Sequence, residues 1–403
     1  MKIPSTIFIF ILLNFLCISS AGQPLSLQLQ VGYFGDTLNI ATNTGIQVQL
    51  QRPVNEQAIK KFYADINQTD YHSLVNSIIS YKNAEKLDDW LFYQLIRRTA
   101  QQLSPKLVDY ERYTLYKWFL LAKCGYNSQL AFAKDKLLFY VQSDDNIYDI
   151  PLFKIDGKQF VCLNIHDFAK VNFEEDQLLK VDISIPEAVN VFSYRVKQLP
   201  DFKTNQYHNK ELVFNYHDIE YRYNVKLNLQ MNKLFSNYPA VDFKYYFNIP
   251  LSKITYSSLI PVLRSELKGM RQQKGIDYLM NFTRHAFMYE TDQQNFGMEK
   301  RLSPEQTLMN TYSDCDDRVA LFYYLVKEIY NLPMIVLEYP SHVAIAIQLK
   351  KPIGNPVLYK GNKYSVCEPT PQRLELPIGK LMPELKDAAY QVKYEYPGKL
   401  EAN

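Results

Sequence analysis

The order of apolar and polar positions divides the chain into alternating and helical stretches. Between residues 25 and 52, apolar and polar residues alternate and Gly and Asn interrupt them, which predicts short strands. From about residue 56 to 126 the repeat becomes helical, most clearly in DDWLFYQLIRRTAQQL and YTLYKWFLLAKCG. LAFAKDKLLFYVQ and KQFVCLNI then predict strands. We therefore expect an α+β domain over residues 22–168.

A second pattern begins near residue 170. The segments LLKVDISIP, VFSYRVKQL, ELVFNY and YRYNVKLNLQ all alternate, which is typical of half-buried strands. In the last of them, one face of the strand would carry Tyr221, Tyr223, Val225, Leu227 and Leu229. These segments predict an antiparallel β-sandwich over residues 169–252.

The last part of the chain, residues 253–403, returns to helices and then strands. LIPVLRSELKGM and GIDYLMNFTRHAFMYE predict helices, and a loop leads to a further helix that starts near Cys315. MIVLEY, HVAIAIQL and KYSVCEP predict three strands. The predicted fold class is therefore α+β in three parts.

The first 21 residues are typical of a secretory signal peptide. Lys2 precedes an apolar run, and Ser19-x-Ala21 fits cleavage after Ala21. A membrane anchor and a lipoprotein cut before Cys17 are the alternatives, but the run is short for a span and Phe15 and Leu16 are bulky for a lipoprotein site. We expect an exported chain, periplasmic or secreted, with no transmembrane segment after cleavage.

Composition narrows the function classes. A net charge of +3 with both signs interspersed does not suggest a nucleic-acid binder. Four cysteines remain after the signal, too few for a disulfide framework in a chain of 403 residues. Cys124 and Cys162 could form a bridge or be two independent buried thiols. No His-Glu-x-x-His or Cys-x-x-Cys motif occurs, so the sequence predicts neither a zinc site nor a cofactor.

Cys315 lies among three aspartates at the head of an amphipathic helix. Ser313 precedes Asp316 by three, a variant of the capping box that would put the thiol in the first turn. The N–H groups of a helix start favour a thiolate, whereas Asp314, Asp316 and Asp317 oppose it. The three aspartates could instead bind a cation, cap the helix or face solvent.

His342 and Glu368 supply the other two groups of a possible catalytic triad. HVAIAIQL begins with His342, KYSVCEP brings in Glu368, and KKPIGNPVLYKG between them predicts a hairpin loop. Eight residues run from His342 to Leu349 and eight from Gly361 to Glu368, so antiparallel pairing would place the two residues opposite each other. A carboxylate there would orient the imidazole. Cys367 would point to the opposite face, into the core.

Three motifs together resemble the transglutaminase-like superfamily of papain fold, in its bacterial exported members. YSDCDDRVALFYYLVKEIYNLP, HVAIAI and VCEPT resemble the family's helix around a Gly-Asp-Cys type motif, its His strand and its Asp-Pro-Thr motif, over about residues 265–385. Glu368 stands where Asp is usual, and Ser313 where Gly is common. The resemblance implies that Cys315 is the nucleophile, His342 the base and Glu368 the orienter, acting on a protein or peptide amide such as a cell-wall peptide.

The sequence of the first part of the chain weakly resembles that of the last part. Aligning Leu115 with Leu321 matches the order of helix, turn and strand, and pairs His342 with Lys136, Glu368 with Leu163 and Cys315 with Asp109. One hypothesis is that residues 56–165 are a degenerate transglutaminase-like repeat without a triad, and the other is an unrelated α+β domain.

Three function classes remain open from the sequence. The first is a thiol-dependent peptidase, amidase or acyltransferase with Cys315, His342 and Glu368 as its triad. The second is a non-catalytic interaction protein or scaffold on the same fold. The third is glycan binding through exposed aromatic residues of the predicted sandwich.

Overall fold

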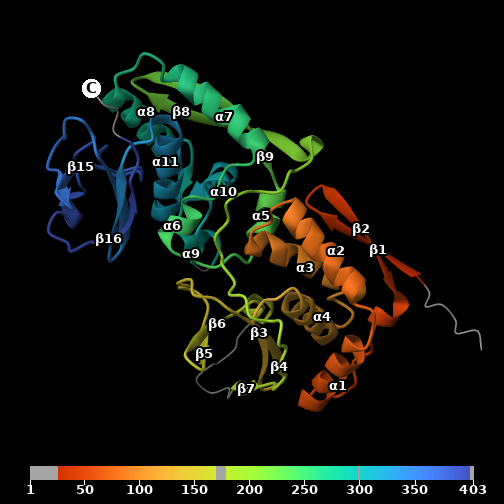
Figure 1. Cartoon of the computed structure of the whole chain (residues 1–403). Coiled ribbons are helices and arrows are strands. Elements are labelled where there is room, and N and C mark those ends of the chain that lie inside the picture. Colours follow the sequence, from red (N-terminus) through yellow and green to blue (C-terminus); the bar gives the residue numbers. More distant parts are fainter. Residues whose placement is uncertain (1–25, 169–177, 298, 400–403) are drawn as a thin grey trace, which may run out of the picture.

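The computed structural model describes residues 26–168, 178–297 and 299–399, and these form a mixed α+β fold with antiparallel main sheets, which agrees with the α+β class of the prediction (Figure 1). The predicted signal peptide lies outside the described residues. In the part of the chain that the structure describes, no helix is both long and apolar enough to span a bilayer.

Within its described residues, the first half begins with a hairpin, continues with four α-helices and ends with a five-stranded sheet. The hairpin is β1 (Ser26–Tyr33) and β2 (Asp36–Asn43), and the helices are α1 (Glu56–Asn67), α2 (His72–Ala84), α3 (Asp89–Leu103) and α4 (Tyr110–Lys123). The sheet strands are β3 (Ser128–Ala133), β4 (Lys136–Gln142), β5 (Leu152–Ile155), β6 (Lys158–Cys162) and β7 (Leu178–Lys180), in the order β5-β6-β4-β3-β7.

The second half also begins with a hairpin and ends with a five-stranded sheet. The hairpin is β8 (Tyr207–Tyr216) and β9 (Ile219–Asn228). The helices are α5 (Gln230–Leu234), α6 (Phe243–Tyr246), α7 (Lys253–Glu266), α8 (Gln272–His285), α9 (Asp292–Asn295), α10 (Pro304–Met309) and α11 (Cys315–Tyr330), and β10 (Met288–Tyr289) pairs with β11 (Tyr312–Ser313). The sheet strands are β12 (Met334–Tyr339), β13 (His342–Ile347), β14 (Val357–Tyr359), β15 (Asn362–Cys367) and β16 (Gln391–Tyr396), in the order β14-β15-β13-β12-β16.

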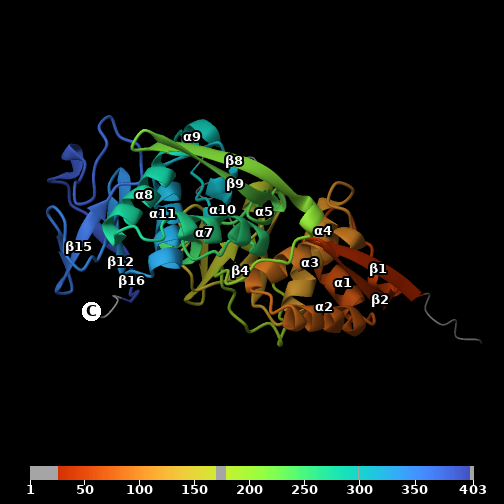
Figure 2. The ribbon, with the colours of Figure 1, turned by 90° about the horizontal axis from the view of Figure 1, so that it is seen from above.

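The two halves share one arrangement of elements. In the order of each sheet, the strands at the third and fourth places come earlier in the chain than those at the first and second, and the strand at the fifth place comes last. Each hairpin packs on a helix pair in the same sense: β2 on α2 and β1 on α3 in the first half, β9 on α7 and β8 on α8 in the second. In each pair the later helix then packs on the helix that precedes the sheet, α4 or α11. Figures 1 and 2 show the two helix-and-sheet units side by side.

The predicted sandwich over residues 169–252 is wrong for the described residues 178–252. They form one two-stranded sheet, β8–β9, while β7 joins the sheet of the first half. VFSYRVKQL (191–199) forms no strand, although residues such as Phe192 and Tyr194 are buried. The alternation was interpreted correctly for Tyr223, Val225 and Leu227, which are buried, but those side chains face helices rather than a second sheet.

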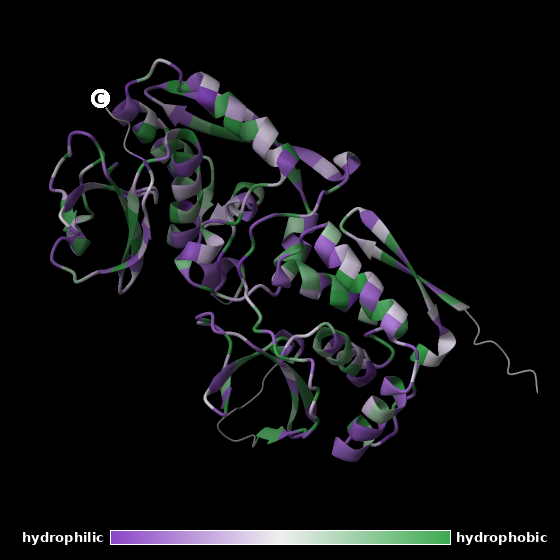
Figure 3. Ribbon diagram, viewed as in Figure 1, coloured by the Kyte–Doolittle hydropathy of each residue, from purple (hydrophilic) through white to green (hydrophobic). Residues whose placement is uncertain are grey.

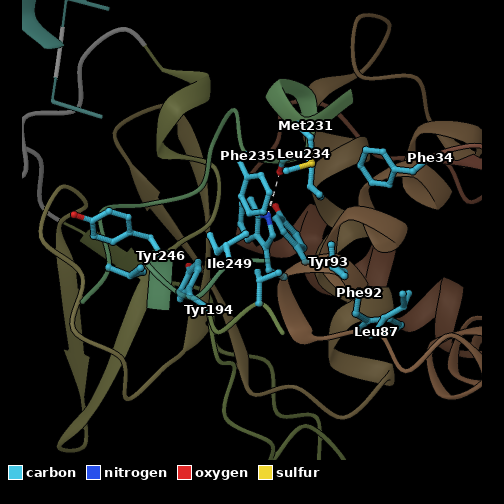
Figure 4. Packing of buried hydrophobic residues seen from close by; sticks show 14 of the residues in the cluster. Phe34, Leu87, Phe92, Tyr93, Tyr194, Met231, Leu234, Phe235, Tyr246 and Ile249 are labelled. Carbon is cyan, nitrogen blue, oxygen red and sulfur yellow. Dashed lines mark hydrogen bonds between the residues drawn. The ribbon is translucent and has the colours of Figure 1, made fainter. Parts of the chain in front are cut away.

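One continuous cluster of buried hydrophobic residues runs through both halves. Figure 4 shows part of it, where Leu234, Phe235 and Ile249 lie near Tyr93 of the first half. The indole N–H of Trp90 also donates to the carbonyl of Leu234 across this boundary (3.1 Å). Figure 3 shows hydrophobic and hydrophilic positions mixed along the helices and strands of both units, as expected when each element buries one face.

Candidate active site

The thiol of Cys315 lies at the first residue of α11. Asp314 is the N-cap, in extended conformation, and its carboxylate accepts from the backbone N–H of Asp317 (3.4 Å). This corrects the expectation that Ser313 caps the helix, because Ser313 belongs to β11 and pairs with Tyr289. Asp314 is the N-cap because a carboxylate is a good acceptor for the unpaired N–H groups at the start of a helix.

His342 and Glu368 form a hydrogen-bonded pair in the second sheet. The Nε2 atom of His342 lies 2.8 Å from a carboxylate oxygen of Glu368, and both side chains are buried. The other oxygen of Glu368 accepts from the backbone N–H of Thr370 (3.0 Å). The pair leaves the Nδ1 atom of the imidazole for a second partner.

The register of β13 and β15 differs by two residues from the predicted one. Ile345 lies opposite Cys367, and one further step along this register brings Ala344 opposite Glu368. His342 is therefore the diagonal neighbour of Glu368 on the same face, within reach of its longer side chain. The predicted hairpin loop at 350–361 is in part the edge strand β14, which pairs with β15 through a tight turn at residues 360 and 361.

The side chain of Cys315 lies near the start of β13. The backbone N–H of Val343 is close enough to the sulfur to favour its thiolate form, and α11 packs on this strand. His342 alternates with Val343 and shares its face with Ala344, which packs in a separate small core away from α11. In the described part of the chain no hydrogen bond joins the sulfur to the imidazole, so the structure brings Cys315 to the neighbour of His342 and joins His342 directly to Glu368.

The surroundings of Cys315 disfavour its thiolate. Burial of the sulfur raises the thiol pKa well above its ordinary value, and Asp316 and Asp314 raise it further. The N–H of Val343 acts in the opposite direction but does not outweigh them. The sequence argument for acidic opposition to the thiolate thus agrees with the geometry.

Arg318 anchors the start of α11, a role that sequence reasoning missed. Its guanidinium is fully buried, and all five N–H groups donate to backbone carbonyls. The acceptors are the carbonyl oxygens of Ser313, Thr283, Arg284, Phe287 and Met288, at 2.7–3.4 Å. Arg318 therefore fixes the end of α8 and strand β10 beside the thiol.

Arg284 extends this network to Glu368. Its guanidinium donates to the backbone carbonyl of Glu368 (3.1 Å from Nε) and to that of Leu376 (3.1 Å). Since Arg318 holds the carbonyl of Arg284, one chain of contacts links the start of α11 to Glu368. An arginine beside the apolar positions Val319 and Phe322 of the predicted helix was the signal that could have revealed this network.

The phenol of Tyr289 is a candidate second oxyanion donor. Cys315 and Asp314 contribute to a raised pKa of this phenol, after burial, which places it in the electrostatic reach of the thiol. Gln294 instead completes a capping box with Thr291.

The first half has a different set of side chains at the equivalent positions. Asp109 caps α4 as Asp314 caps α11, so Tyr110, not Asp109, takes the place of Cys315. Lys136 begins β4 as His342 begins β13, and the register of β4 with β6 makes Asn164, not Leu163, equivalent to Glu368.

A closed polar network occupies this first-half position. The side-chain amide of Asn164 donates to the Tyr110 hydroxyl (2.8 Å), which in turn donates to a carboxylate oxygen of Asp167 (3.0 Å). Asn164 is fully buried and also accepts from the N–H of Phe139 (2.8 Å). The equivalent site therefore carries a phenol and an amide where the second half carries a thiol and a carboxylate.

The structure also shows where the other cysteines and the aromatic residues of the β8–β9 hairpin lie. Cys124 and Cys162 are both free thiols, and Cys367 lies fully buried in the main core as expected. Phe214 and Tyr223 of the β8–β9 hairpin pack on α8, through Tyr278 and Phe282, so these aromatics do not offer a glycan platform. Comparisons with protein-family models, curated proteins and solved structures find no match for this chain.

Proposed function

We propose that the protein is a thiol-dependent amide hydrolase or acyltransferase of transglutaminase-like fold, with Cys315, His342 and Glu368 as its triad. The observation that carries this proposal is the buried bond of 2.8 Å between His342 and Glu368, next to a strand peptide that contacts the thiol. A carboxylate in that position fixes the ring and stabilises its charged form. The network of Arg318 and Arg284 supports the proposal, because it holds both ends of the site on rigid elements.

The chemistry would proceed in two steps. In the first step, His342 would take the proton of the thiol, and the sulfur would attack the carbonyl carbon of a peptide amide. The N–H groups at the start of α11 and the hydroxyl of Tyr289 would stabilise the oxyanion. The imidazolium of His342 then protonates the departing amine, which leaves a thioester on Cys315.

The second acceptor decides between two outcomes of this reaction. Water would release the acid and make the protein a peptidase or amidase, whereas an amine would form a new amide bond. We favour hydrolysis of a peptide or protein amide outside the cytoplasm. The proposed location depends on the signal peptide predicted from residues 1–21.

Alkylation by iodoacetamide across pH tests the proposal. The expected result is that Cys315 reacts roughly tenfold or more faster than Cys367, and that His342→Ala removes this difference. His285→Ala is the matched control, because His285 pairs with Glu375 (3.1 Å) at a more exposed place. Equal rates at Cys315 and Cys367 would reject the enzyme.

A non-catalytic scaffold is the second candidate, and the raised pKa of the Cys315 thiol is the observation that favours it. In that case the halves act as a pair of binding units and His342→Ala changes stability alone. The same alkylation experiment distinguishes the two candidates.

We infer further that the first half is a degenerate copy of the second. The support is the shared strand order, the shared packing of hairpin on helix pair, and the aspartate caps at Asp109 and Asp314. The copy would extend beyond the predicted residues 56–165 to include β1–β2 and β7. Its closed network around Tyr110 provides no nucleophile, which suits a scaffold.

A further inference from the structure

A pocket of about 700 Å³ lies between α3 and α5, where the two halves meet (Figure 1). Most of its lining residues belong to α3, and the others come from β1, the segment after α3, α4 and the region of α5. A volume of this size is typical of small-molecule sites. The described lining residues do not include those of the candidate triad, so this is a separate place in the fold.

Positive charge dominates the lining of this pocket. Four of the lining residues are cationic, namely Arg97, Arg98, Lys106 and Lys233. Among the lining residues that the structure describes, there is no aspartate or glutamate. Asp167, which is not one of the lining residues, pairs with Lys106. Four cations against one carboxylate make the pocket attractive for an anion.

A buried donor without a partner lines the same pocket. The side-chain carbonyl oxygen of Gln94 accepts from Nη1 of Arg97 (3.1 Å), which fixes the orientation of the amide. The Nε2 group of Gln94 is buried and has no hydrogen-bond partner within the described part of the chain. A buried N–H group in this state is costly unless an acceptor lies beside it. Because Gln94 lines the pocket, a bound anion can be that acceptor.

The cations of the pocket retain donors for a ligand. Arg97 donates to Gln94, and Arg98 donates through Nη1 to the carbonyl oxygen of Gly32 (3.0 Å). A guanidinium has five N–H groups, so both arginines keep others. Lys233 is exposed, and its ammonium makes no hydrogen bond or ion pair with any described residue. Guanidinium groups suit the bidentate recognition of a phosphate or carboxylate.

A buried lysine behind the pocket experiences the same positive charges. The ammonium of Lys117 lies 4.5 Å from the centre of the Tyr113 ring, and Tyr113 lines the pocket. Burial lowers the pKa of Lys117 to about 7, with further lowering by Arg97 and Lys106 and with opposition from Asp167. An anion in the pocket would relieve the repulsion among these cations.

We propose that this pocket binds the phosphate group of a small polar molecule such as a sugar phosphate. Four cations around one pocket favour a dianion, and a phosphate monoester carries a charge of about −1.5 to −2 at neutral pH. The side-chain amides of Gln101, Gln102 and Asn232 also line the pocket and are suited to the hydroxyl groups of the carrier. The site does not depend on the chemistry of Cys315.

Calorimetric titration of the full chain near neutral pH with sodium phosphate, glucose 6-phosphate and glucose 6-sulfate tests this proposal. We expect one site per chain with a Kd of about 1 mM or tighter for glucose 6-phosphate. Inorganic phosphate should bind at the same site and compete with the sugar phosphate. Glucose 6-sulfate has the same sugar but a single negative charge, so it should bind roughly tenfold more weakly.

Two variants of lining residues locate the site. Gln94→Leu should weaken the binding of glucose 6-phosphate by roughly tenfold. It should not lower the urea midpoint of the chain without ligand, because it replaces an N–H group that has no partner. Lys233→Gln, at an exposed position where folding is not at risk, should weaken binding by roughly 2- to 5-fold. Lys61→Gln removes an exposed lysine that pairs with Asp65 on α1, and this control should bind as the unaltered chain does.

The proposal is overturned if neither sodium phosphate nor glucose 6-phosphate binds up to about 10 mM. It is also overturned if Gln94→Leu and Lys233→Gln bind glucose 6-phosphate as the unaltered chain does. Equal affinity for glucose 6-phosphate and glucose 6-sulfate would reject the assignment of a dianion. These outcomes leave the alkylation test of Cys315 unaffected, so the pocket and the proposed enzyme can each fail alone.

Discussion

The imidazole of His342, at the start of β13, and the carboxylate of Glu368, directly after the end of β15, are joined by a buried hydrogen bond of 2.8 Å. The two residues are diagonal neighbours and not direct partners in the ladder, so the bond depends on the length of the glutamate side chain. An aspartate at position 368 would be one methylene shorter. The glutamate at position 368 therefore fits this register.

Glu368→Gln should lower the rate of the proposed acyl transfer by roughly 10²–10⁴-fold, because an amide does not stabilise the charged imidazole. The rate of p-nitroanilide peptide cleavage or of Cys315 alkylation measures this effect. Glu375→Gln is the matched control, since Glu375 contacts His285 at the surface. An unchanged rate in Glu368→Gln would exclude Glu368 from the triad.

Asp314→Asn should make Cys315 more reactive without loss of the helix cap, because Asn caps about as well as Asp but carries no charge. Burial, Asp316 and Asp314 raise the thiol pKa, so the thiolate of the unaltered chain keeps increasing as pH rises beyond the ordinary thiol range. Removing one charge should lower the pKa and speed alkylation at pH 8 by roughly 3- to 10-fold, measured in EDTA. Asp109→Asn removes the cap charge of α4 and should leave the rate unaltered.

Arg318→Met should lower the free energy of unfolding by about 3–5 kcal/mol, because it leaves five buried carbonyls without their donors. Urea unfolding followed by Trp fluorescence measures this loss. Arg222→Met removes exposed ion pairs with Glu211 and Glu220 and should have little effect. A comparable midpoint in both variants would contradict the anchoring role.

Tyr110→Phe should cost about 1–3 kcal/mol of stability, since the Asn164 amide and the Asp167 carboxylate each lose a partner. Alkylation of Cys315 should not change, because the first half has no part in the proposed chemistry. Tyr148→Phe, which removes an exposed bond to Asp242, is the stability control. Altered reactivity of Cys315 in Tyr110→Phe would show that the two halves are coupled.

Local patterns predicted most of the elements that position the site. The helices α3 and α4, the strands β12, β13 and β15, and the burial of Cys367 all follow from spacing within one segment. β14 and β16 were missed, because their short patterns become strands only through pairing with β15 and β12. The register of β13 with β15 depends on the segment that joins them. This segment contains the edge strand β14, and the observed pairing differs by two residues from the predicted one.

Alternation reports that one face of a strand is buried, not what covers it. This is why the β8–β9 hairpin was interpreted as half of a sandwich, although α7 and α8 cover it. The contacts of Arg318 and Arg284 join residues far apart in the chain, and no spacing rule contains them. The helix caps and the strand register make Tyr110 equivalent to Cys315 and Asn164 equivalent to Glu368. Each of these two equivalences lies one position beyond the residue that the sequence alignment had paired.

The hairpin β8–β9 has a practical consequence for anyone who trims this protein. A fragment that starts at residue 253, as the sequence pattern would suggest, would remove the cover from α7 and α8 and bare Tyr278 and Phe282 to water. Such a fragment should aggregate even though it retains every residue of the candidate triad. A fragment that starts ahead of Tyr207 would retain the hairpin that covers α7 and α8. It is the shortest fragment in which the reactivity of Cys315 should be measured.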